Sequence, residues 1–152
     1  MYQKILVPLD GSAVAECALV HARTVAIGLQ VPEVVLLATV EPLHRLREVL
    51  QPQTLAKTEV EADLYLKKVA EDMKKEGITA TTVLKISDDP ATEILNYVQN
   101  NDVGLIIMST HGRSGPSRWA FGSVADRVVR HSIVPVTIIP PEQCRTAERG
   151  QW

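Results

Sequence analysis

Short apolar segments alternate with helical patterns along nearly the whole chain, and this alternation limits the fold more than any other feature. Residues 34–40 are apolar apart from Thr39 and rich in β-branched side chains, as in a strand that is buried on both faces. Residues 4–9, which are apolar after Lys4, and residues 105–108 are shorter runs of the same kind. Strands that alternate with helices are typical of a parallel sheet covered by helices on both sides, so the sequence predicts an α/β fold.

Four helices are expected between and after these strands. The first starts at Ser12 and ends near Leu29, and a longer one carries Leu66 and ends at Gly77, a typical C-cap. The third begins after Asp89, which is followed by a proline and is therefore a good N-cap. For the fourth, Ser123 and Asp126 have the spacing of a capping box, so it should run from residue 124 to about residue 131.

Two further strands carry the marks of sheet edges. Residues 79–86 alternate between two faces, and residues 134–139 contain Pro135, which has no N–H to donate to a neighbouring strand. With these two strands outermost and right-handed crossovers throughout, the economical strand order is 3-2-1-4-5. The expected fold is an open five-stranded parallel sheet of the Rossmann-like type, with helices on both faces. Its winding reverses between strands one and four, so the loops after Leu9 and Met108 should form the binding site.

Composition and charge exclude several classes of protein. The formal net charge is −2 and no basic block is present, which argues against binding to a nucleic acid. No apolar run approaches the ~20 residues that span a bilayer, and the first residues lack the pattern of a signal peptide. We therefore expect a cytoplasmic protein with one domain over residues 1–141 and a flexible tail over residues 142–152.

Cys17 and Cys144 lack the spacing of a metal site and are expected to be free thiols.

The stretch from Met108 to residue 125 carries the strongest signal for function. Gly112 and Gly115 follow the fourth strand and allow backbone N–H groups to approach a phosphate, while Ser123 stands where the next helix begins. Turn glycines and an ordinary serine cap would give the same pattern without any ligand. The Gly-Lys-Ser/Thr phosphate loop and the Gly-x-Gly-x-x-Gly pattern are both absent, which disfavours a standard P-loop NTPase and a dinucleotide dehydrogenase.

The same stretch resembles the universal stress protein family, whose nucleotide-binding members carry Gly-x2-Gly-x9-Gly-Ser/Thr. Here the pattern reads Ser109-x2-Gly112-x9-Gly122-Ser123, with serine in place of the first glycine. Residues 4–12 resemble the first strand and turn of the family, and residues 123–139 its last helix and strand. The resemblance thus covers nearly the whole chain.

This resemblance implies a set of site residues. The residues at the end of the first strand, Pro8, Leu9 and Asp10, would border the adenosine, and Val40 would offer backbone contacts to adenine. The residues around the phosphates would be Gly112, Arg113, Gly122, Ser123 and Val124. The nucleotide-binding set is Pro8, Leu9, Asp10, Val40, Met108, Ser109, His111, Gly112, Arg113, Gly115, Gly122, Ser123 and Val124.

Three members of this set leave alternatives open. Asp10 could accept hydrogen bonds from ribose hydroxyls and help to hold a divalent cation, or could belong to a tight Asp-Gly turn that caps the first helix. Arg113 could pair with a phosphate or be a solvated loop arginine. His111 could brace the loop or take part in catalysis, but no nucleophile motif accompanies it.

The expected function is regulatory binding of ATP or a related adenine nucleotide in a stress response, with Mg²⁺ or Mn²⁺ near the phosphates. The family resemblance also implies a homodimer formed through the last strand, where an exposed apolar edge would favour pairing. Two alternatives stay open: a slow ATPase or nucleotide hydrolase, and a dimeric interaction module that has lost its ligand. The replacement of the first motif glycine by Ser109 favours the last of these.

Overall fold

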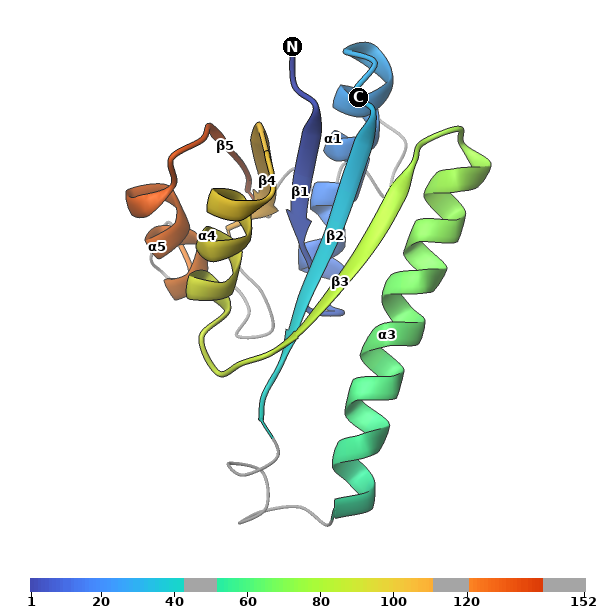
Figure 1. Ribbon diagram of the computed structural model, residues 1–152, viewed down its shortest axis with the longest axis vertical. Helices are drawn as coiled ribbons and strands as arrows, with labels where there is room; N and C mark the ends of the chain where they lie inside the picture. Colours follow the sequence, from blue (N-terminus) through green and yellow to red (C-terminus); the bar gives the residue numbers. More distant parts are fainter. Residues whose placement is uncertain (43–51, 111–120, 141–152) are drawn as a thin grey trace.

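The computed structural model describes residues 1–42, 52–110 and 121–140, with side chains in the second range described from residue 58 onward. The elements follow one another as β1 (Lys4–Pro8), α1 (Ala13–Gly28), β2 (Glu33–Val40), α3 (Pro52–Lys75), β3 (Ala80–Ile86), α4 (Pro90–Asn100), β4 (Leu105–Ser109), α5 (Ser123–His131) and β5 (Val136–Ile139). This order matches the expected alternation of strands and helices (Figure 1).

The five strands form one parallel sheet in the order β3-β2-β1-β4-β5, as predicted. β1 lies at the centre, where Ile5 pairs with Val34 of β2 on one side and with Leu105 of β4 on the other. The chain therefore winds outward from β1 in one direction as far as β3, and then in the other direction as far as β5. The reversal lies between β1 and β4, which is the expected position of a binding site in an open α/β sheet.

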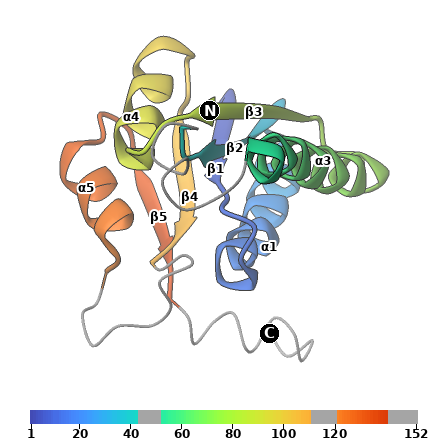
Figure 2. The same ribbon diagram turned by 90° about the horizontal axis from the view of Figure 1, so that it is seen from below.

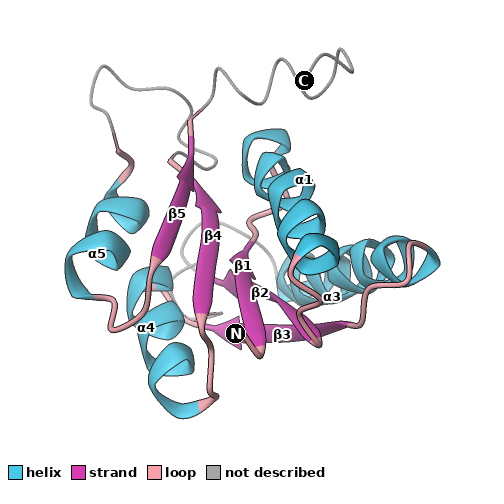
Figure 3. Cartoon of the chain, turned by 90° about the horizontal axis from the view of Figure 1, so that it is seen from above, coloured by secondary structure: helices cyan, strands magenta, loops and turns pink. Residues whose placement is uncertain are grey.

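Two apolar layers cover the two faces of the sheet. α1 and α3 pack on the face that presents Ile5, Val7 and Leu36, and Met73 of α3 is fully buried there. α4 and α5 pack on the opposite face, which presents Leu6 and the other alternate side chains of the strands. Figure 3 shows the two pairs of helices on either side of the strands. Because β1, β2 and β4 are buried on both faces, their sequences are mostly apolar rather than alternating.

The two predicted edge strands lie at the edges, but the last one begins later than expected. β5 starts at Val136 rather than at residue 134, so Pro135 precedes the strand. The proline has no N–H, but its carbonyl accepts a hydrogen bond from the Ile106 N–H at 3.0 Å. Gly77, which follows the last residue of α3, adopts a φ of +82°, as expected of a C-cap.

The expectation of free thiols is wrong for Cys17, which is disulfide-bonded in this structure. Cys144, the second of the two cysteines, lies outside the described residues. Sequence spacing gave no sign of the bond, because it does not report which distant segments approach each other in space.

None of the helices that the structure describes combines the length and hydropathy needed to cross a bilayer.

Candidate functional site

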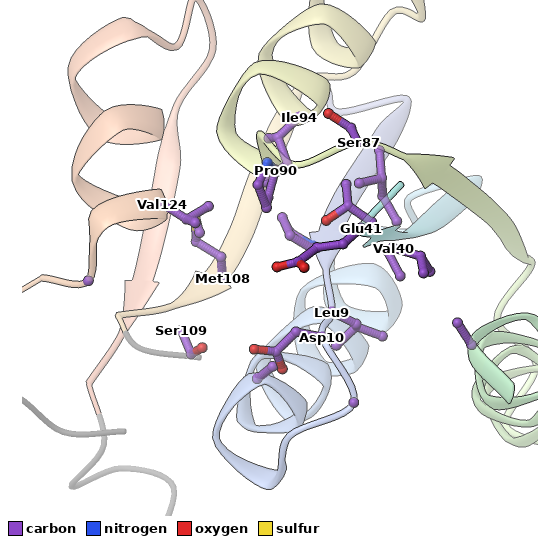
Figure 4. Close-up of a pocket in the computed structure, with 18 of the residues that line it drawn as sticks. Leu9, Asp10, Val40, Glu41, Ser87, Pro90, Ile94, Met108, Ser109 and Val124 are labelled. Atoms are coloured by element: carbon purple, nitrogen blue, oxygen red, sulfur yellow. The ribbon is translucent and has the colours of Figure 1, made fainter. Parts of the chain in front are cut away.

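A cavity of about 780 Å³ lies at the carboxyl ends of the strands, at the reversal between β1 and β4. Figure 2 shows the molecule from this side, and Figure 4 shows the cavity lining in close-up. The described lining comprises Pro8, Leu9, Asp10, Gly11 and Ala15 after β1, residues 37–41 at the end of β2, Thr58, Glu61, Ala62 and Tyr65 on α3, Ser87, Asp88, Pro90 and Ile94 around the start of α4, residues 108–110 after β4, and residues 122–125 at the start of α5.

The turn after β1 fixes Asp10 at the cavity wall. The backbone N–H and the hydroxyl of Ser12 both donate to Oδ1 of Asp10, at 2.9 and 2.6 Å. The Ser12 oxygen in turn accepts from the Ala15 N–H at 3.1 Å and so caps α1. Gly11 between them has a φ of +80°, which suits a residue without a Cβ. The structure therefore assigns the cap to Ser12, and the Asp10 carboxylate braces that cap.

The start of α5 differs from the sequence prediction. Its N-cap is Gly122, no side chain makes a capping hydrogen bond, and Ser123 is the first helical residue. The predicted capping box is therefore wrong, and the Asp126 carboxylate instead accepts from Arg130 Nε at 2.9 and 3.0 Å. The reason is that Gly122 has taken the extended cap conformation one residue earlier, with a φ of −70° and a ψ of 163°. The first N–H groups of α5 thus have neither an intrahelical partner nor a side-chain cap.

Backbone hydrogen bonds hold this helix start against the end of β4. The Gly122 N–H donates to the Thr110 carbonyl at 2.7 Å, and the Thr110 N–H donates to the Ile139 carbonyl at 3.1 Å. Ser109 and Thr110 are both buried, with 7% and 4% of their surface exposed. Thr110 and Gly122, which are twelve positions apart in the sequence, consequently meet at one corner of the cavity.

The start of α4 forms the neighbouring wall and is capped in the ordinary way. Asp89 accepts from the Thr92 N–H at 3.2 Å and from the Thr92 hydroxyl at 2.7 Å, which confirms its expected role as N-cap. Arg127 of α5 donates to Asp89 Oδ1 at 2.7 Å and to Thr92 Oγ1 at 2.9 Å. Hydrogen bonds from Thr92 and then from Arg127 lower the pKa of Asp89 to about 2. One arginine in the middle of α5 thereby ties this helix to the start of α4.

Charge is distributed unevenly around the cavity. Its described lining includes the acidic residues Asp10, Glu41, Glu61 and Asp88, and no lysine or arginine. Among the described residues, no group of three or more histidine, cysteine or acidic side chains gathers as a metal site. Within the described lining, attraction for an anion therefore comes from backbone N–H groups and from the positive end of the α5 dipole.

Most residues of the sequence-predicted set meet at this cavity. Nine of them line it, from β1, β2, β4 and α5: Pro8, Leu9, Asp10, Val40, Met108, Ser109, Gly122, Ser123 and Val124. The other four, His111, Gly112, Arg113 and Gly115, lie outside the described residues. One backbone group of the set is already engaged, since the Val40 carbonyl accepts from the Ser87 N–H at 2.9 Å.

Sequence reasoning missed the contribution of α3, which places Thr58, Glu61, Ala62 and Tyr65 on the lining. The signal that could have revealed it is length. At 24 residues α3 is about 36 Å long, whereas the seven-residue β3 that follows spans about 23 Å. A helix longer than the strand beside it must extend past the sheet, and here it extends past the carboxyl ends.

Comparisons with known proteins agree with this architecture. The model of the universal stress protein family matches residues 1–140. Universal stress protein MJ0531 of Methanocaldococcus jannaschii is 31% identical over 146 residues, covering 91% of this chain and 82% of that protein. The solved structure of MJ0577, from the same organism, superposes with a TM-score of 0.82 at 28% identity and covers 92% of this chain and 96% of that one.

Two further solved structures share the fold. Universal stress protein UspA of Lactobacillus plantarum superposes with a TM-score of 0.78 at 26% identity, covering 91% of this chain and 97% of its own. A universal stress protein of Archaeoglobus fulgidus in complex with dAMP has a TM-score of 0.67 at 24% identity, covering 91% and 98%.

Proposed function

Since this chain belongs to the universal stress protein family, we propose that it binds an adenine nucleotide in the cavity at the carboxyl ends of its strands. The protein is proposed to bind the nucleotide without hydrolysing it, and the nucleotide-bound protein would have a regulatory role in a stress response. The observation that carries the proposal is the start of α5, which has no side-chain cap and opens into a cavity of about 780 Å³ at the topological reversal.

The phosphates are proposed to lie at this helix start. The backbone there presents N–H groups without a capping partner, and the Ser123 hydroxyl can add a donor. By family resemblance, Gly112 and Arg113 would complete the phosphate site.

The nucleoside is proposed to lie between Asp10 and the end of β2. The Asp10 carboxylate, held in place by Ser12, can accept a hydrogen bond from a ribose hydroxyl. Leu9, Val40 and Met108 supply buried apolar surface against which a purine ring can pack.

A divalent cation, Mg²⁺ or Mn²⁺, is proposed to accompany the phosphates. Asp10 is the carboxylate on the described lining that fits this role, although one of its oxygens already accepts two hydrogen bonds from Ser12. Such a cation would take most of its ligands from the phosphates and from water, as Mg²⁺ usually does. Its chemical contribution would be to neutralise the phosphate charge.

Ligand binding is tested most directly by heat release of small molecules from the freshly purified protein, followed by mass analysis. In parallel, ATP, ADP, AMP and cyclic AMP are added and the thermal midpoint is measured. At a hundred times its dissociation constant a ligand stabilises the folded state by about 2.7 kcal/mol, which should raise the midpoint by about 5 to 10 °C. No shift with any of the four would reject nucleotide binding and favour the interaction module, in which the Ser109 side chain occupies the position of the motif glycine.

Gly122→Val locates the phosphates. The backbone of Gly122 has extended dihedral angles that valine also adopts, so the fold should survive, while the added side chain should obstruct the helix start. The matched control is Gly28→Val, because a Cβ at Gly28, at the far end of α1, meets nothing within 4 Å. We expect Gly122→Val to lose nucleotide binding and Gly28→Val to retain it. Equal binding by both variants would place the phosphates elsewhere.

We also propose a homodimer formed through β5. The strand is at an edge of the sheet, and Ile138 is half-buried while Thr137 is exposed. An edge strand offers unpaired backbone groups to a second copy around a two-fold axis. Thr137→Asp and Ile138→Asp should then yield monomers in light scattering. A dimer unchanged in both variants would move the interface to another surface, and a monomeric parent protein would refute the dimer itself.

A further inference from the structure

Tyr65 of α3 lies between two cavities. It lines the cavity at the carboxyl ends of the strands and also a second cavity of about 450 Å³, whose described lining comes from α1 and α3. These two helices pack on the same face of the sheet (Figure 2). Its side chain as a whole is half-buried, but the hydroxyl oxygen is buried and makes no hydrogen bond in the described part of the structure. Arg23 Nε, on the second cavity, is likewise without a hydrogen bond but has an ion pair with Glu76 at 3.3 Å.

A buried hydroxyl without a partner requires an explanation, because folded proteins contain few such groups and each one weakens the fold. Burial and the nearby Glu16 carboxylate raise the pKa of Tyr65, and the charge of Asp10 acts in the same direction. The hydroxyl therefore keeps its proton and is a hydrogen-bond donor at neutral pH. Glu16 lies near enough to act on this pKa, yet the hydroxyl makes no hydrogen bond of ordinary geometry to it.

The position of α3 shows which part of a nucleotide could reach this donor. α3 packs beside β2 and β3, whereas α5 packs beside β5, on the other side of the central strand β1. A nucleotide whose phosphates lie at the start of α5 must extend its nucleoside away from that helix, toward β2 and α3. Asp10, whose charge raises the pKa of Tyr65, lines the cavity after the central strand β1, between α5 and α3.

We infer that the Tyr65 hydroxyl donates a hydrogen bond to an acceptor on the nucleoside part of the bound nucleotide, which makes Tyr65 a ligand-binding residue supplied by α3. The inference rests on the proposed nucleotide binding. It accounts for the missing partner of the hydroxyl, and because that oxygen is buried, the ring must rotate slightly toward the cavity for the hydroxyl to reach the nucleoside. The competing explanation is structural: a small rotation would pair the hydroxyl with Glu16 and leave the ligand untouched.

The test replaces the hydroxyl alone, with Tyr65→Phe. Its matched control is Tyr97→Phe, because Tyr97 on α4 is also half-buried but lines neither cavity. Affinities for AMP, ADP and ATP are measured by calorimetry, and the thermal midpoint is measured without ligand. We expect Tyr65→Phe to weaken all three nucleotides by the same factor, about threefold to tenfold, the usual worth of one hydrogen bond. Tyr97→Phe should leave the three affinities unchanged.

The midpoint without ligand separates the two explanations. Removing a hydroxyl that has no partner should leave the midpoint unchanged or slightly raised, whereas breaking a bond to Glu16 should lower it. Unchanged affinities in Tyr65→Phe would overturn the inference, as would a loss of affinity that grows with the number of phosphates. If the parent protein bound none of the nucleotides, the proposed function itself would be refuted. If the parent protein bound them and Tyr65→Phe bound them with the same affinities, only the inference about Tyr65 would be refuted.

Discussion

Ser123→Ala separates the two roles that a serine can play at the start of a helix. As an N-cap, Ser123 would hold α5 together, and alanine would cost about 1 kcal/mol of unfolding free energy. In the structure Gly122 is the cap and Ser123 is the first helical residue, without a capping hydrogen bond. Alanine has the higher helix propensity, by up to about 0.5 kcal/mol. We therefore expect the variant without ligand to be as stable as the parent protein, or more stable by up to about 0.5 kcal/mol.

The assay is urea unfolding followed by circular dichroism, with and without saturating ATP, and Ser12→Ala is the control. Ser12 makes the hydrogen bond that Ser123 lacks, accepting from the Ala15 N–H at 3.1 Å, so the same substitution there should cost about 1 kcal/mol. With ATP, Ser123→Ala should lose part of the ligand's stabilisation, because the hydroxyl donor to phosphate is gone. A loss without ligand as large as that of Ser12→Ala would refute our reading of the α5 start.

Two further predictions concern stability. The pKa of Asp89 is lowered from its usual 3.8 to about 2 in the folded protein, so its interactions with Thr92 and Arg127 stabilise the fold above about pH 4 and are lost as the pH falls through 2. Asp89→Asn should accordingly be less stable than the parent at pH 6, and the difference in unfolding free energy should shrink as the pH falls through 2; a difference that stays the same at every pH would contradict this. Ile106→Ala should cost about 2–5 kcal/mol in urea unfolding, because Ile106 is fully buried at the centre of its layer, and a loss below 1 kcal/mol would mean that the layer is loosely packed.

The fold was predictable because each strand carries an independent signal. Residues 34–40 are apolar apart from Thr39 because β2 is buried on both faces, and the alternation in residues 79–86 reflects the half-exposed edge position of β3. Once the two edge strands are known, the rule that crossovers between parallel strands are right-handed excludes most of the possible strand orders. The start of α5 was less predictable, because Gly122 and Ser123 are both acceptable caps and the choice depends on the hydrogen bond from Gly122 to Thr110.

The site was predictable where the backbone itself forms it. Asp10 and Ser109 follow central strands, so topology alone brings them to the same edge of the sheet. Tyr65 and Glu61 were not predictable in this way, since they belong to the part of α3 that overhangs the sheet. Local periodicity describes which face of a helix is apolar, but it does not describe where along the neighbouring strands the helix begins.

The central position of β1 also determines the sequence of events while the chain is being synthesised. β1 finds its partner β2 early, but its other partner, beginning with Leu105, leaves the ribosome about 5 to 20 seconds later at ordinary rates of synthesis. During that interval the first half of the protein has an unpaired central strand, with Leu6 uncovered on the side that α4 and α5 later bury. The cavity draws its walls from both halves, so a nascent chain offers no complete pocket until α5 has emerged. Occupancy of the pocket would therefore distinguish finished molecules from unfinished ones.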